Sequence, residues 1–309
     1  MANIIQKDFL SITNHMFEFC NGYTVMVWGC GIAGQFVNYL FKRNNKIIDY
    51  NLDRNHNVYS QRPYIIRNFD PKYTRIIVTF QIDSETESYL SDNGFRKGKE
   101  YEQLSRWFGK TDAPIIGFEN WIESYYNLDL TSVPENGTMK IDEDSHNFHW
   151  GAHDYKFMEA FDSFVVNDED AIFDYGCGKG GALLLLKLAG FKKVGGVEYD
   201  EYLYKKAVKN FNKMHLESEA LIRGNAASLT KEIDEYNYFF LYDPFVGKQF
   251  ELVIQNISDS FKRNERKITL IYASPQCDRI ICEKGGFVLT KRIEADCLEY
   301  PGINIYVMK

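Results

Sequence analysis

A turn in the second half of the chain combines glycines and acids in a pattern that could bind a nucleoside. Residues 174–180 read D-Y-G-C-G-K-G, and Glu198 follows later in the chain. Glycine lacks a Cβ atom, so the backbone of such a turn can pass close under a ligand. A carboxylate such as that of Glu198 can accept two hydrogen bonds from ribose hydroxyls. These residue types in this order therefore predict a nucleotide-binding site.

The elements predicted around this turn would hold its residues at one edge of a sheet. Residues 171–173 are apolar and predict a buried parallel strand, and residues 182–189 predict a helix. Residues 193–197 predict a second strand, which ends at Glu198. Strand, glycine turn, helix and strand with a terminal acid form the first half of a nucleotide-binding α/β sheet. The alternative is a glycine-rich turn in an α/β domain that binds nothing.

The acid before the first glycine separates two classes of ligand. A carboxylate at Asp174 would repel a pyrophosphate, whereas it would attract an ammonium or a sulfonium group. Together with Glu198, the D-x-G-x-G-x-G pattern resembles that of the class I S-adenosyl-L-methionine (SAM) methyltransferases. The resemblance covers residues 146–309 and implies a Rossmann-like α/β domain whose seven-stranded sheet closes in an antiparallel strand pair. It also implies SAM as the cofactor and methyl transfer as the reaction.

The resemblance implies roles for further residues of this half. The glycine turn would carry the methionine part of SAM, Glu198 would hold the ribose, and Tyr199 would lie beside the adenine. Asn225 would meet the adenine amino group. Residues 243–245, D-P-F, follow a predicted apolar strand at the position that lies against the methyl group, with a strand-ending turn as the alternative. The predicted SAM-binding residues are Asp174, Gly176, Cys177, Gly178, Gly180, Glu198, Tyr199, Asn225, Ala226, Asp243, Pro244 and Phe245.

Three residues are candidates for catalysis. Asp243 could orient or deprotonate a hydroxyl or amine acceptor. The corresponding motif of amino methyltransferases has two prolines, whereas this chain has only Pro244, so the motif does not specify a nitrogen acceptor. In methyltransferases of this type the segment before the first strand commonly covers SAM and touches the acceptor, which makes His153 and Tyr155 candidates as well. The alternative is a solvated loop in which Trp150 packs.

The same segment contains His146, His149 and His153, at spacings of three and four residues. On a helix these imidazoles would share one face and could bind a metal ion. However, Gly151 interrupts the run, and Asp154 has the character of an N-cap for the helix that follows. We therefore predict no metal site.

A second glycine turn, G-x-G-x-x-G, stands near the N-terminus between a predicted strand and a predicted helix, and an acid follows the next predicted strand. This βαβ pattern predicts a Rossmann-like module over residues 1–110, followed by a linker over residues 111–145. The module resembles those attached to sugar-modifying and polysaccharide-synthesis enzymes, which implies a nucleotide or nucleotide-sugar ligand. A module that only packs or dimerises is the alternative, and NAD-dependent redox chemistry is disfavoured because no Tyr-x-x-x-Lys follows a further strand. The predicted second nucleotide site consists of Gly29, Gly31, Gly34 and Asp53.

Composition limits the classes of partner. The 309 residues carry a formal net charge of -7, which does not favour a nucleic-acid partner. No apolar run reaches membrane-spanning length, and the N-terminus does not read as a signal peptide. The six cysteines have no CxxC spacing and are typical of reduced thiols in the cytoplasm.

The sequence thus predicts a two-domain cytoplasmic methyltransferase with SAM as its cofactor. The predicted acceptor is a small molecule, with a nucleotide-linked sugar or a glycan precursor as candidates, and the chain is a candidate homo-oligomer. The alternatives are a protein methyltransferase, or a non-catalytic protein that binds dinucleotides or nucleotides.

Overall fold

The computed structural model describes residues 3–55, 60–109, 117–132, 155–162, 164–218, 220–294 and 302–308. Within this part of the chain there are two compact units. Residues 4–127 make up the first unit, and the described residues from 128 onward, apart from residue 155, belong to the second. Residues 117–127, which fall in the predicted linker, thus belong to the first unit.

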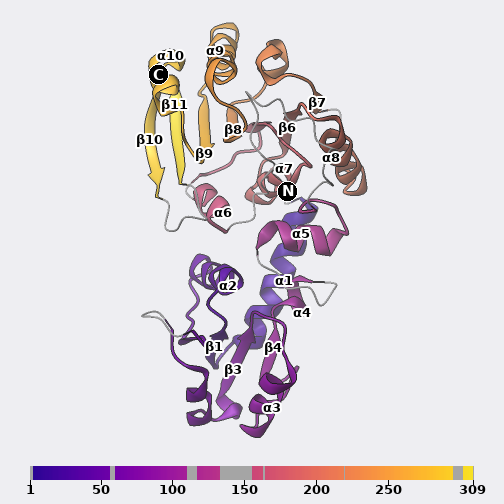
Figure 1. The fold of residues 1–309 in the computed structure, drawn as a ribbon, viewed down its shortest axis with the longest axis vertical. Coiled ribbons are helices and arrows are strands. Elements are labelled where there is room, and N and C mark those ends of the chain that lie inside the picture. The colour runs from indigo at the N-terminus through magenta and orange to yellow at the C-terminus, as the bar shows by residue number, and fades with distance from the viewer. Residues whose placement is uncertain are drawn as a thin grey trace. The chain divides into compact units, whose positions relative to one another are not determined.

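A four-stranded parallel sheet lies at the centre of the first unit (Figure 1). In spatial order its strands are β2 (Tyr50–Leu52), β1 (Thr24–Trp28), β3 (Thr74–Val78) and β4 (Tyr101–Gln103). The helix α2 (Ile32–Arg43) leads from β1 to β2, and α3 (Ser84–Asp92) leads from β3 to β4. The two crossovers run in opposite directions, so the strand order reverses between β1 and β3. The predicted order of strand, turn, helix and strand around the glycine turn of residues 29–34 is present.

Aromatic packing stabilises the rest of the first unit. The ring of Phe36 in α2 lies 4.9 Å from that of Phe118, and the ring of Phe9 lies 5.1 Å from that of Trp121. Such tilted and edge-on ring pairs contribute about 0.5–1.5 kcal/mol each beyond the area that they bury. The remaining elements of this unit are α1 (Ile4–Cys20), η1 (Pro63–Asn68), η2 (Pro71–Tyr73), α4 (Ser105–Phe108) and α5 (Phe118–Tyr126).

The second unit contains a seven-stranded sheet (Figure 1). The strand β11 runs antiparallel to both of its neighbours, β9 and β10, and the other neighbouring strands are parallel. A closing antiparallel pair is the arrangement that the family resemblance implies. In spatial order the strands are β10 (Phe287–Ile293), β11 (Ile303–Met308), β9 (Thr269–Ala273), β8 (Tyr238–Tyr242), β5 (Ala171–Tyr175), β6 (Lys193–Glu198) and β7 (Leu221–Arg223).

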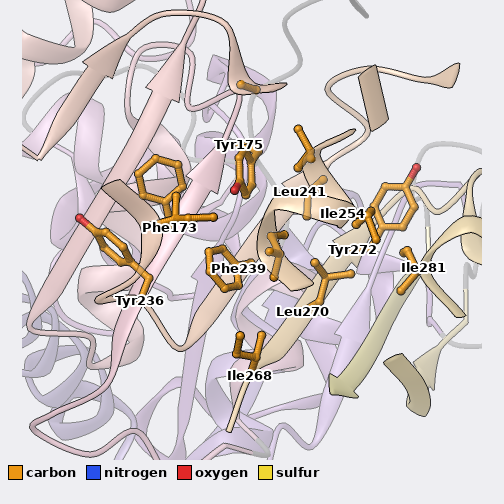
Figure 2. Packing of buried hydrophobic residues seen from close by; sticks show 14 of the residues in the cluster. Phe173, Tyr175, Tyr236, Phe239, Leu241, Ile254, Ile268, Leu270, Tyr272 and Ile281 are labelled. Atoms are coloured by element: carbon orange, nitrogen blue, oxygen red, sulfur yellow. The ribbon is translucent and has the colours of Figure 1, made fainter. Parts of the chain in front are cut away.

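Both faces of the central strands are covered, which explains why β8 has no alternation of apolar and polar residues and why all of β5, including Asp174, is buried. On one face Phe239 and Leu241 pack with Ile254 and Ile281, as Figure 2 shows. On the other face the ring of Phe240 lies 5.1 Å from that of Phe157. The helical elements of the second unit are α6 (Tyr155–Phe161), α7 (Gly181–Ala189), α8 (Glu201–Lys213), η3 (Ala226–Ser228), η4 (Lys231–Ile233), α9 (Gly247–Arg263) and α10 (Asp278–Gly285). None of the helices in the described ranges is both long and apolar enough to traverse a bilayer.

Candidate cofactor-binding site

The strand order of the second sheet reverses at β5. This strand lies between β6, to which the chain passes first, and β8, which it reaches later. In open α/β sheets ligands bind at the carboxyl ends of the strands, in the crevice at such a reversal. The glycine turn follows β5, Glu198 ends β6 and Asp243 follows β8. Three of the predicted motifs therefore meet at one edge of the sheet.

The glycine turn lies against the segment after β8. Gly176, Gly178 and Gly180 all have positive φ angles, of 89°, 52° and 86°. A Cβ atom at Gly176 would lie 2.8 Å from the Cβ of Pro244, so a side chain at this position would displace the proline. The absence of a side chain thus lets the D-P-F segment and the turn pack together, and it leaves backbone rather than side chains at the sheet edge.

The Glu198 carboxylate is held in place by the backbone around it. Its Oε2 accepts a hydrogen bond of 2.8 Å from the Gly178 N–H, and its Oε1 accepts one of 2.8 Å from the Asp200 N–H. Glu198 is only 8% exposed, so its carboxylate is enclosed by the fold and is not a solvent-exposed group at the end of the strand. Burial raises the pKa of Glu198, and these two N–H groups partly offset the rise. Each carboxylate oxygen has a second lone pair, so both can still accept from ribose hydroxyls.

Asp174 differs from the sequence-based expectation of a charged group that faces the ligand. It lies within the buried strand β5 and is only 2% exposed. Burial raises the pKa of its carboxyl well above the usual range, and the charge of Glu198 raises it further. Burial therefore disfavours the ionised form of this carboxyl in the free protein. A cationic ligand nearby would favour ionisation, so the predicted charge complementarity requires that ligand to be present.

Cys177 is buried beneath the turn. Its thiol packs against β6, where a Cβ atom at Gly196 would lie 2.8 Å from the Cys177 Cβ and 3.1 Å from its Sγ. Burial raises the pKa of this thiol well above its usual range, and the nearby acids, Glu198 among them, add to the rise. Only the backbone of Cys177 can therefore contact a ligand. Its neutral side chain packs against β6 and stabilises the position of the turn on the sheet.

The predicted adenine contacts lie beside Glu198. Tyr199 directly follows β6 and is exposed. The turn that holds Asn225 is tied to β6 by a hydrogen bond of 3.0 Å from the Gly224 N–H to the Glu198 carbonyl. The Oδ1 of Asn225 accepts a hydrogen bond of 2.8 Å from the Ala227 N–H at the start of η3. Ala226 is buried, so its contribution at this edge is limited to its backbone.

Asp243 has a backbone conformation that residues other than glycine rarely adopt. Its φ angle is 39°, in the left-handed region, which costs about 1–3 kcal/mol and occurs often at functional sites. Its Oδ2 accepts a hydrogen bond from the Gln276 side-chain amide. Burial raises the pKa of the Asp243 carboxyl, and the Gln276 hydrogen bond partly offsets this rise. A carboxyl group in this environment is suited to accept a proton.

Phe245 lies elsewhere than expected. Its side chain is buried in the hydrophobic core beneath α9, with its ring 6.3 Å from that of Phe250. The backbone bends at Asp243, and the Phe245 ring packs inward instead of standing at the sheet edge. The structure therefore does not support the expected contact between the Phe245 ring and the methyl group of SAM.

The structure adds a lysine and an aspartate that sequence reasoning did not single out. The Lys179 side chain, within the glycine turn, is fully buried, and its Nζ lies 2.8 Å from Asp129 Oδ1. The same Nζ donates to the Ser132 carbonyl and hydroxyl, both at 2.6 Å. The Asn210 side chain donates to the Asp129 carbonyl at 2.9 Å. These contacts hold residues 128–132 against the glycine turn and α8. The ion pair joins positions that are far apart in the sequence, so no local pattern predicts it.

No family model and no curated protein matches this chain. Solved structures do match. The mitomycin 7-O-methyltransferase MmcR is 10% identical over 50% of this chain and 53% of its own, with a TM-score of 0.36. The chain thus spans about half the length of that enzyme. Several of these structural neighbours are SAM-dependent methyltransferases.

Two of these neighbours were solved with a cofactor or its product. An RNA methyltransferase from Salinibacter ruber, in complex with S-adenosyl-L-homocysteine, is 17% identical over 50% of this chain and 88% of its own, with a TM-score of 0.36. Magnesium protoporphyrin IX methyltransferase from Synechocystis PCC 6803, with bound SAM, is 19% identical over 50% of this chain and 76% of its own, with a TM-score of 0.35.

Other predicted site residues cannot be placed. His146, His149, Trp150 and His153 lie outside the described residues. Tyr155 begins α6, but its side chain is also outside them. Asp243 is thus the candidate catalytic residue whose surroundings are known. Among the described residues, no group of three or more histidine, cysteine, aspartate or glutamate side chains could hold a metal ion.

The second glycine turn, in the first unit, is tied to its acid in a similar way. Asp53 Oδ2 accepts a hydrogen bond of 2.7 Å from the Cys30 N–H, and its Oδ1 accepts one of 2.8 Å from the Asn55 N–H. At Gly34 a Cβ atom would overlap the Gly29 carbonyl, because α2 begins directly against the end of β1. Gly29, Gly31, Gly34 and Asp53 therefore lie together, and the contacts that hold them together are internal to the fold.

Proposed function

We propose that the second unit binds SAM and transfers its methyl group to an acceptor. The observation that carries the proposal is the convergence at the end of β5. Gly178 donates to the Glu198 carboxylate, and Gly176 packs against Pro244. The glycine turn, the oriented carboxylate of Glu198 and Asp243, which precedes Pro244, thus share one edge of the sheet. This edge is at the strand-order reversal, where α/β folds bind ligands.

The residues present fit this cofactor. The glycine turn offers backbone without Cβ atoms for the methionine part, and Glu198 offers two oriented oxygens for the ribose hydroxyls. We expect the adenine to extend towards Tyr199, which follows β6, and Asn225, whose turn is hydrogen-bonded to β6. SAM supplies an electrophilic methyl group on a sulfonium, and the task of the protein is to align an acceptor with it and keep water out. Alignment of this kind can contribute roughly 7–11 kcal/mol at best.

Asp243 is the residue that we propose to act on the acceptor. It stands after β8, next to the turn, and its carboxyl has a raised pKa because of burial. A carboxylate with raised proton affinity can orient an acceptor hydroxyl or amine and take up the proton that the acceptor loses. His153 and Tyr155 remain candidates for the same role from the segment before β5.

We propose a small-molecule acceptor, with a nucleotide-linked sugar or a glycan precursor as candidates. The net charge of -7 does not favour RNA or DNA, and the first unit has a nucleotide-binding type of sheet. A protein acceptor is the alternative within the same reaction. A cytoplasmic location and self-association are also part of the proposal.

Isothermal titration with SAM tests the cofactor assignment. We expect micromolar binding to the intact protein, and a loss of at least about tenfold in Glu198→Ala, because two charge-assisted hydrogen bonds to the ribose are removed. Glu201→Ala is the matched control, since Glu201 is an exposed carboxylate at the start of α8, three residues after Glu198. Equal SAM affinity in both variants, or binding of NAD with no binding of SAM, would contradict the proposal.

A further inference from the structure

The first unit contains a cavity that the predicted glycine site does not include. Its volume is about 660 Å³, within the range of about 300–1,000 Å³ that is usual for small-molecule sites. It lies between η1 and α3, beyond the end of β1, and Trp28, Arg54, Arg62, Tyr64, Thr86 and Tyr89 are among its lining residues. Neither Gly29, Gly31 and Gly34 nor Asp53 lines it. The cavity is nevertheless beside the strand-order reversal between β1 and β3, where ligands of such sheets bind.

The apolar part of the cavity is aromatic. The rings of Trp28 and Tyr89 lie 6.1 Å apart at 79°, and the exposed Tyr64 lines the cavity from η1. The Tyr89 hydroxyl donates to the Pro63 carbonyl at 3.3 Å and so joins α3 to η1 across the cavity. Trp28 is 2% exposed, and its indole N–H is buried without a hydrogen-bond partner. Trp28 therefore offers little accessible surface, and the aromatic surface that a planar ligand can contact comes mainly from the exposed Tyr64 and the partly buried Tyr89.

Two arginines give the cavity a binding point for an anion. Arg54 Nη2 donates to the Thr86 hydroxyl at 3.0 Å and lies 3.8 Å from an oxygen of Asp83, so its guanidinium is oriented at the start of α3. A guanidinium has five N–H groups, which leaves others for a ligand. Arg62 lines the cavity from the start of η1. The fork geometry of arginine suits the bidentate recognition of phosphate.

Carboxylates of α3, the helix against which Arg54 is held, limit the charge that the cavity accepts. Glu85 and Asp92, both in α3, also line it. They would repel a free polyanion but can accept hydrogen bonds from sugar hydroxyls. A ligand that combines a planar ring, a hydroxylated sugar and a short phosphate chain matches all three parts of the lining.

We infer that this cavity is a binding site for a nucleoside diphosphate. The base would lie among the aromatic rings, the phosphates at Arg54 and Arg62, and the sugar towards the α3 carboxylates. This assignment moves the ligand of the first unit away from the glycine turn. It does not depend on the proposed methyl transfer, because all of its residues belong to the first unit.

Titration of the full chain with UDP, uridine and pyrophosphate tests the inference. We expect UDP to bind, and to bind at least about tenfold more tightly than either fragment, because each fragment engages only one part of the lining. Trp28 should report binding through its fluorescence, and this signal should disappear in Trp28→Phe while calorimetry still detects UDP. No binding of UDP at about 1 mM, or equal affinity for pyrophosphate and UDP, would overturn the inference.

Two substitutions separate the cavity from the glycine turn. Arg62→Ala should weaken UDP binding at least about tenfold, whereas Lys72→Ala, in η2 of the same unit but outside the cavity, should leave it unchanged. A Cβ atom at Gly31 would meet nothing within 4 Å, so Gly31→Ala should fold normally and retain full UDP affinity. Loss of UDP binding in Gly31→Ala with no change in Arg62→Ala would overturn the inference and place the phosphates at the turn. The thermal unfolding midpoint of each variant, together with its affinity for SAM, separates a local effect from unfolding.

Discussion

Replacement of Asp129 by asparagine removes the charge that compensates a fully buried lysine. Lys179 Nζ donates to Asp129 Oδ1 at 2.8 Å, and Lys206 donates to the other oxygen of the same carboxylate. Burial by itself would raise the pKa of Asp129, but the hydrogen bonds from Lys179, Lys206 and Ser132 outweigh it and hold this pKa well below its usual range. The carboxylate is therefore charged at neutral pH, and asparagine keeps its shape without its charge.

The structure sets the size of the expected effect. Breaking a buried ion pair by removing one partner costs about 3–5 kcal/mol, because it leaves an uncompensated buried charge. Asp129 is 30% exposed, while Lys179 is fully buried, so water can reach the pair only from the aspartate side. We therefore expect Asp129→Asn to lower the free energy of unfolding of the second unit by about 3 kcal/mol, at the lower end of this range. The double variant Asp129→Leu with Lys179→Met should recover at least half of this loss, since both charges are then absent.

The pH dependence of this loss has a defined sign. An acid whose pKa is lowered in the folded state stabilises the fold at pH values above its unfolded-state pKa of about 3.9. This contribution disappears as the pH falls through the folded-state pKa. The difference between the original protein and Asp129→Asn should therefore be full at neutral pH and should shrink in strongly acidic solution.

The assay must report on the second unit. Trp28, Trp107 and Trp121 all belong to the first unit, so tryptophan fluorescence would follow mainly that unit. Hydrogen exchange of peptides from residues 171–198, measured by mass spectrometry in increasing urea, follows β5, the glycine turn and β6 directly.

The control for this experiment is an exposed ion pair of the same unit. Asp168 pairs with Lys192, and both side chains are well exposed. Asp168→Asn should leave the urea midpoint unchanged, because exposed pairs contribute little. If Asp129→Asn shifted the midpoint no more than Asp168→Asn does, the assignment of a compensating charge to Asp129 would be refuted.

Three further predictions concern the strands beside the glycine turn, β5 and β6. Asp174→Asn should stabilise the ligand-free protein, and increasingly so as the pH rises above about 4. The reason is that an acid whose folded-state pKa is raised destabilises the fold once the pH exceeds its unfolded-state pKa. Urea unfolding at several pH values measures this effect, and a variant less stable than the original protein at neutral pH would contradict it. The same variant should bind SAM more weakly by calorimetry, since a neutral amide cannot ionise beside a cation. Gly196→Ala should destabilise the second unit by about 1–3 kcal/mol through overpacking against Cys177, and Gly224→Ala, where a Cβ atom has space, is its control in the same urea titration.

The sequence by itself determined the local parts of the candidate site. Apolar runs and glycine spacing were sufficient to predict the strand before the turn at residues 174–180, the helix after it and the strand that ends at Glu198. These features depend on neighbouring residues, because strand periodicity and the conformational freedom of glycine act over a few positions.

Tertiary structure decided which side chains those parts bring together and in what electrostatic state. Only packing shows that Asp174 is buried with a raised pKa, that Phe245 points into the core, and that Lys179 pairs with Asp129. The cavity beside Trp28 likewise joins residues of three separate elements that share no motif. Burial and pairing depend on contacts between distant positions, and the pattern of any one segment does not specify its partners.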